Sequence, residues 1–220
     1  MAINKSHSPA WVKIVVWVII VAFVLTGVGF GGSAILKGLA NATQSGGTTS
    51  TSTNNTASTD TLEIINTAFQ PLATSLEASI TADPENLALL TKAGSTYMDW
   101  AYQLYNSTDT NAQAAFSSTM AAAIPYWERA QKLSPADRTI AGDLATALFY
   151  AGRTADAITL AEKTLKDNPD YATVWFNLGI FKEASGDTAG AKTAYQKAID
   201  TDTEGSVKQS AQTALDALNK

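Results

Sequence analysis

The chain has 220 residues, of which 45% are apolar and 16% charged, and its formal net charge is −5. It has no Cys and one His, His7, which excludes disulfides, thiolate metal sites, Cys nucleophiles and, downstream, His-based triads and zinc sites. All twenty acidic residues but only twelve of the fifteen basic ones lie in 41–220, so this part carries a charge near −8. Because nucleic-acid binding depends on a basic surface, we expect no nucleic-acid partner.

An uncharged run of 23 residues, 14–36, follows the polar N-terminal segment 1–13. A membrane-spanning helix needs ~20 consecutive apolar residues, so we expect 14–36 to be a single transmembrane anchor. Lys5 and Lys13 precede this run and only Lys37 follows it closely. Since positive charge is enriched on the cytoplasmic side, this favours a cytoplasmic 1–13 with the C-terminal part outside the cytoplasm.

The alternative for the N-terminal segment is a secretory signal that is cleaved after Ala40-Asn41-Ala42, a small-x-small pattern. Cleavage there would release the downstream part as a secreted protein. We favour the uncleaved anchor because the apolar region of a signal is only ~7–15 residues long.

Residues 37–59 are predicted to be a flexible linker. From Asn41 to Thr59 they contain only Ser, Thr, Asn, Gly, Gln and Ala. Such a segment cannot bury enough apolar surface to offset the entropy of ordering it, and ~19 residues of this kind reach about 25 Å.

From residue 60 onward, apolar residues recur at spacings of three and four, the pattern of amphipathic helices. The first helix is expected from Asp60 to near Pro84. The segment 85–137 is predicted to be a pair of lengthened helices, with Ala93-Gly94 in the first helix and Trp127 in the second.

Two more regular units follow, 138–171 and 172–205. Equivalent residues lie 34 positions apart at four places: Pro135 and Pro169, Leu144 and Leu178, Gly152 and Gly186, Ala157 and Ala191. A last amphipathic helix over 206–219 is expected to open with a capping box at Ser206–Gln209 and to cover the apolar face of the last unit.

The stretch 172–202 resembles the tetratricopeptide repeat, in which Trp, Leu-Gly and a large apolar residue are followed by Ala, an aromatic residue and Ala. The matching residues here are Trp175, Leu178-Gly179, Phe181, Ala191, Tyr195 and Ala198. Lys182 departs from the pattern, where Tyr is usual, as does Thr203, where Pro is usual. The resemblance implies an all-α, tetratricopeptide-like solenoid of antiparallel helix pairs over 60–220, after one N-terminal transmembrane helix.

Carboxylates are the only plentiful groups that could carry catalysis. The pairs Asp167/Asp170 and Asp200/Asp202 lie at expected helix ends, where capping and solvation explain them. The segment 200–204 lacks the full spacing of a calcium loop. We expect no enzyme activity, cofactor, metal or small-molecule substrate; the alternative is an anchored or secreted enzyme subunit that uses carboxylates.

The resemblance also implies a protein-binding groove along the first helix of each pair. The residues in its register here are Phe149, Tyr150, Phe176, Ile180 and Glu183. The basic residues with which the family clamps a peptide carboxylate are absent around Thr139, Gly142, Thr146 and Thr173. We therefore expect a protein or peptide partner with an amphipathic or basic helical segment.

Together these patterns predict a single-pass membrane protein with an extracytoplasmic repeat domain. Its expected role is that of a protein–protein interaction scaffold or accessory factor for complexes of the cell envelope.

Overall fold

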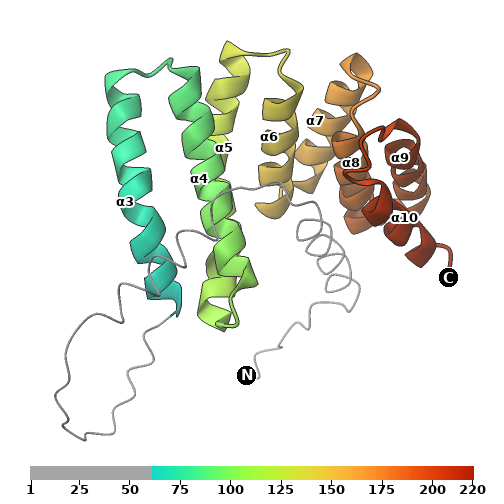
Figure 1. Cartoon of the computed structure of the whole chain (residues 1–220), viewed down its shortest axis with the longest axis horizontal. Coiled ribbons are helices and arrows are strands. Elements are labelled where there is room, and N and C mark those ends of the chain that lie inside the picture. Colours follow the sequence, from blue (N-terminus) through green and yellow to red (C-terminus); the bar gives the residue numbers. More distant parts are fainter. Residues whose placement is uncertain (1–60) are drawn as a thin grey trace, which may run out of the picture. The chain divides into compact units, whose positions relative to one another are not determined.

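The computed structural model describes residues 61–220, and this part of the chain consists of α-helices joined by short turns (Figure 1). The all-α prediction is confirmed for these residues. In chain order the helices are α3 (Thr61–Ala82), α4 (Leu87–Asn106), α5 (Thr110–Leu133), α6 (Arg138–Tyr150), α7 (Thr154–Asp167), α8 (Ala172–Ser185), α9 (Thr188–Thr201) and α10 (Lys208–Ala217).

The predicted N-terminal segment, transmembrane helix and linker (1–13, 14–36 and 37–59) lie outside the described residues. Among the helices of 61–220, none combines the length and the apolar character that crossing a bilayer requires. The described residues divide at Ser134 into two compact units, one holding α3 to α5 and the other α6 to α10.

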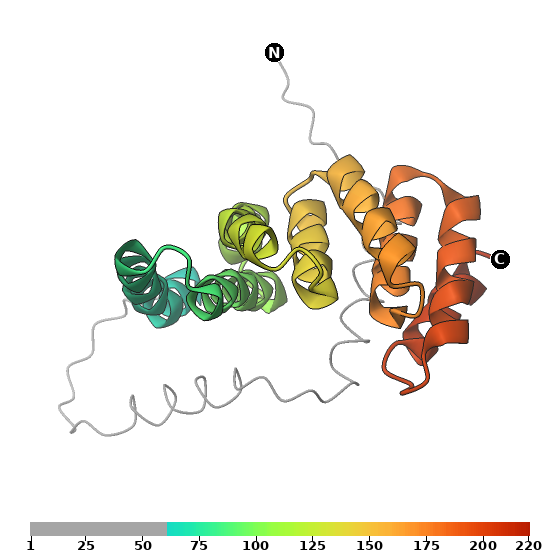
Figure 2. The same cartoon turned by 90° about the horizontal axis from the view of Figure 1, so that it is seen from above.

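Three long helices lying side by side form the first unit, and Figure 2 shows them nearly end-on in cyan to yellow-green. The Asn86 and Asp109 side chains cap α4 and α5 by accepting hydrogen bonds from the backbone amides of Leu89 and Asn111. One core cluster joins all three helices, with Ile65 and Phe69, Leu104 and Ala112 as its buried members.

A glycine beneath an aromatic ring brings α4 and α5 together. A Cβ placed on Gly94 would lie 2.5 Å from Cε2 of Trp127, closer than two carbon atoms can approach. The Trp127 ring is buried, and its Nε1 donates to Sδ of Met98 at 3.2 Å. The pair Gly94 and Trp127, which the sequence analysis placed in the first and the second helix of this pair, therefore determines how closely the two helices pack.

A row of stacked rings fastens α3 to α4 and α5. Neighbouring centroids lie 5.6 to 6.1 Å apart along the row of Phe69, Trp100, Tyr97 and Tyr126. Glu77 of α3 accepts hydrogen bonds from both tyrosine hydroxyls, and Nε1 of Trp100 donates to Oδ1 of Asn66 at 3.0 Å. Burial, and then the hydrogen bond to Glu77, raises the pKa of Tyr97, so its hydroxyl remains a donor at neutral pH.

The second unit is built from successive neighbours. Each helix from α6 to α10 packs on the next, and α6 also contacts α8. Gly152 and Gly186 end α6 and α8 with φ values of 85° and 88°, which a residue with a side chain rarely adopts. The amide after each glycine closes the same turn, from Arg153 to the carbonyl of Leu148 at 2.8 Å and from Asp187 to that of Lys182 at 2.9 Å.

The pair α8–α9 repeats the glycine contact of the first unit. A Cβ on Gly179 would overlap the ring of Tyr195. In the pair α6–α7 the equivalent positions are Ala145 and Ala161, both buried. The pair α6–α7 therefore packs through two alanines where α8–α9 packs through a glycine and a tyrosine.

Asp202, rather than a capping box, holds the start of the last helix. Its carboxylate accepts hydrogen bonds from the amides of Ser206, Val207 and Lys208, at 3.1, 2.7 and 2.7 Å, and from the Ser206 hydroxyl. Val207 occupies the N-cap position and offers no side-chain bond. The prediction of a capping box between Ser206 and Gln209 is therefore wrong, because the acceptor comes from the end of α9.

We predict that Asp202→Ala destabilises the docking of α10 by ~1–2 kcal/mol, the scale of a lost helix cap. Burial alone would raise the pKa of Asp202, but the three amides and the Ser206 hydroxyl outweigh it and hold that pKa below its usual range. The stabilisation is therefore complete above the ordinary carboxyl pKa of ~3.9 and is lost as the pH falls through the lower folded value.

Hydrogen exchange of the α10 amides checks this prediction. Ser206→Ala, which removes only the hydroxyl bond, is the control and should change exchange much less. Equal exchange in the Asp202→Ala variant and the parent would contradict the assignment.

Candidate functional site

The first helices of the two regular pairs, α6 and α8, lie against each other. Nδ2 of Asn177 donates to Oγ1 of Thr146 at 3.2 Å across the contact. A Cβ on Gly142 would lie 3.2 Å from Cγ2 of Val174, so the two backbones approach closely at that point. This contact places side by side the two helices that carry the predicted groove residues. The candidate surface is formed by those of the predicted residues that remain partly exposed.

Phe149 and Tyr150 form the α6 part of this surface, and both are partly exposed. The Phe149 ring stacks on Phe181 of α8, with centroids 4.6 Å apart, and meets Tyr150 edge-on at 5.1 Å. The two rings are thus held in place by packing, while part of each faces solvent. A pre-positioned aromatic pair of this kind is suited to binding an apolar segment of a partner.

Phe176 and Ile180 of α8 belong to the core instead. Only 5% of Phe176 and 4% of Ile180 is exposed. The Phe176 ring lies 5.8 Å from that of Tyr195, because Gly179 lets α9 approach the same side of α8. The expectation that these two side chains line an open groove needs correction, whereas partner binding at the remaining residues stays a prediction.

Glu183 lies at the C-terminal end of α8 and is partly buried. Its Oε2 accepts a hydrogen bond from the Tyr195 hydroxyl at 2.8 Å. Burial raises the pKa of Glu183, and the bond from Tyr195 offsets part of that rise. The carboxylate is therefore committed to an internal partner while it still gives the surface a negative charge.

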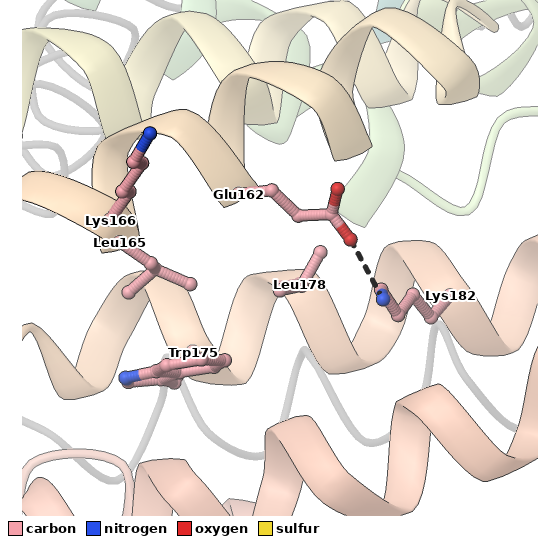
Figure 3. Close-up of a pocket in the computed structure, with 6 residues that line it drawn as sticks. All are labelled: Glu162, Leu165, Lys166, Trp175, Leu178 and Lys182. Atoms are coloured by element: carbon pink, nitrogen blue, oxygen red, sulfur yellow. Dashed lines mark ion pairs between the residues drawn. The ribbon is translucent and has the colours of Figure 1, made fainter. Parts of the chain in front are cut away.

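A pocket of about 320 Å³ lies between α7 and α8, and the sequence analysis did not predict it (Figure 3). Its lining residues are Glu162, Leu165 and Lys166 of α7 with Trp175, Leu178 and Lys182 of α8. The one signal in the sequence was Lys182, which departs from the repeat pattern. A Tyr at that position would be bulkier and uncharged.

Three of the four acidic residues noted in the sequence, Asp170, Asp200 and Asp202, have local structural roles. Asp170 forms an ion pair with Arg138 at 3.5 Å, Asp200 accepts from Gln196 at 2.9 Å, and Asp202 caps α10. Across 61–220, no group of three or more His, Cys, Asp and Glu residues could hold a metal ion.

Part of the second unit matches a known family model. Residues 143–206 match the family model described as tetratricopeptide repeat, a stretch that contains most of α6 and all of α7, α8 and α9. The segment around the candidate surface is therefore similar to tetratricopeptide repeats.

Individual relatives cover only parts of the chain. An Hsp70-Hsp90 organizing protein of Triticum aestivum is 36% identical over 95 residues, which are 42% of this chain and 16% of that protein. The chain thus matches about a sixth of the length of this curated relative.

Two solved structures share the fold, both with a TM-score of 0.50. One, titled "MamA MSR-1 C2", is 22% identical, and the match covers 64% of this chain and 72% of that one. The other, titled "Crystal structure of MamA", is 20% identical and the match covers 71% and 90%. With the family match, these structures confirm the predicted all-α, tetratricopeptide-like architecture.

We predict that Phe176→Ala lowers the free energy of unfolding by ~3–5 kcal/mol, as Leu178→Ala does by ~2–5 kcal/mol, because both remove buried side chains. Tyr150→Ala removes a partly exposed ring and should cost about 1 kcal/mol or less. Urea titration followed by far-UV circular dichroism measures all three. If Phe176→Ala were as stable as the parent, Phe176 could not be part of the core.

Proposed function

We propose that the chain is a protein–protein interaction module whose partner binds across α6 and α8. The observation that carries the proposal is the surface itself. Within the segment that matches tetratricopeptide repeats, Phe149 stacks on Phe181 of α8, Tyr150 packs edge-on against Phe149, and both rings remain partly exposed. The wheat relative is named as an organizing protein for two others, Hsp70 and Hsp90, and this supports a protein-binding role.

The chemistry of the surface favours an amphipathic or basic helical segment as the partner. Its partly exposed rings are aromatic, and the charged residue among the predicted groove residues, Glu183 near the end of α8, is acidic. Thr139 and Thr146 stand where a clamp for a peptide carboxylate would need basic side chains. A basic face on the partner would pair with Glu183, while apolar residues would contact Phe149 and Tyr150.

Site-specific photo-cross-linking tests this function. A photoreactive phenylalanine analogue in place of Tyr150 should form a discrete adduct with another protein in intact cells. The same analogue in place of Gln196, an exposed residue of α9, is the control and should not. Phe149→Ala should weaken the adduct at residue 150 while changing far-UV circular dichroism little. Equal adducts at residues 150 and 196, or none at either, would contradict the proposed surface.

We further propose that this module is anchored in a membrane by residues 14–36 and acts in the cell envelope as a scaffold or accessory factor. The uncharged run of 23 residues and the excess of Lys ahead of it support this proposal.

Topology mapping checks the anchor. A reporter fused after Lys220 should be active outside the cytoplasm and should sediment with membranes through an alkaline wash. A mature protein that begins at Thr43 would instead show that the segment is a cleaved signal.

A further inference from the structure

We infer that the pocket between α7 and α8 is a second docking site, which takes a short acidic segment of a partner protein with one apolar side chain inserted. The inference extends the proposed protein-binding function to a surface different from the one formed by α6 and α8. For this inference to hold, the pocket must be large enough for a side chain, and its charge must favour acidic neighbours of that side chain. It must also be separate from the first surface.

The walls of the pocket are apolar. Leu165 of α7 and Leu178 of α8 are almost completely buried and form its floor. Trp175 is partly exposed beside them, and its Nε1 already donates to the carbonyl of Pro169 at 2.8 Å. Since the polar group of the indole is engaged, the rest of the ring is left to contact an apolar group. A volume of about 320 Å³ is at the small end of the ~300–1,000 Å³ of ligand pockets, which suits one or two side chains.

An ion pair closes one end of the pocket. Nζ of Lys182 lies 2.8 Å from Oε1 of Glu162, so the pair links α8 to α7 across the opening (Figure 3). Oδ2 of Asp187 lies 3.8 Å from the same ammonium group. One ammonium group and two carboxylates therefore meet at this end, which has no cationic group left for a ligand.

The other end is positively charged. Lys166 is exposed there, next to Leu165 on α7 with its ammonium group pointing outward (Figure 3), and within the described part of the chain it forms no ion pair. A carboxylate next to the inserted side chain would reach this ammonium group, and its attraction would favour acidic segments over basic ones. Trp and Arg are the residues most often central to binding energy in interfaces, which makes Trp175 the expected apolar anchor.

The pocket uses a stripe of α8 different from the one that carries Glu183. Trp175, Leu178 and Lys182 follow one another at spacings of three and four and so share one stripe of α8. Glu183 falls on a different stripe, since each residue turns the helix by about 100°. The two surfaces also prefer partners of opposite charge, a basic segment on the first and an acidic segment in the pocket, so one experiment can separate them.

The test uses the full chain in detergent micelles and two fluorescein-labelled, end-blocked hexapeptides. Each has a Leu-Phe centre, flanked on both sides by two Asp residues in one peptide and by two Lys residues in the other. Fluorescence anisotropy should show tighter binding of the Asp-flanked peptide. Lys166→Glu should lower the affinity for the Asp-flanked peptide about tenfold and raise the affinity for the Lys-flanked peptide. Lys163→Glu makes the same charge change on an exposed residue of α7 outside the pocket. It should change the affinity for either peptide by no more than about twofold. Trp175→Ala should weaken both peptides, with far-UV circular dichroism as the check on folding.

Four results would overturn the inference. Equal losses in Lys163→Glu and Lys166→Glu would show that only overall charge matters. Loss of the Asp-flanked peptide in Tyr150→Ala but not in Lys166→Glu would place it on the first surface. Absence of binding up to about 1 mM peptide, with the photo-adduct at residue 150 intact, would reject the pocket and leave the proposed function standing. Self-association of the chain that is lost in Lys166→Glu, seen by light scattering, would make a second copy the occupant.

Discussion

The close contact between a glycine and an aromatic ring is the constraint on which the rest of the structure depends. In α4–α5 and again in α8–α9, the first helix has a glycine at the point where an aromatic ring of the second helix packs against its backbone. The approach sets the distance between the paired helices and thus the position of everything attached to them. The burial of Phe176 and the hydrogen bond between Tyr195 and Glu183 both follow from it.

Much of the helical architecture could be predicted because its signals are local or repeat. Apolar spacing located the helices, and the interval of 34 residues between Gly152 and Gly186 located two turns that the structure shows to be alike. Apolar spacing also assigned Gly94 and Trp127 to the first and second helix of the lengthened pair, and the structure shows that these two residues meet.

The surface properties could not be predicted equally well, since they depend on which neighbour a side chain meets. Phe176 has the helical register of a groove residue, but its exposure is decided by how near α9 comes. The start of α10 is held by Asp202, several residues away across a turn, so inspection of the residues at the cap itself could not identify the acceptor. The α7–α8 pocket needs six residues from two helices, and only Lys182 stood out in the sequence.

Glu77 makes the packing of α3 depend on both of the other helices in the first unit. One carboxylate of α3 receives a hydroxyl from Tyr97 of α4 and another from Tyr126 of α5, and the core cluster beside it also draws on all three helices. The complete docking site for α3 therefore exists only after α4 and α5 have paired. A substitution that separates α4 from α5 would therefore also loosen α3, although α3 precedes both helices in the chain.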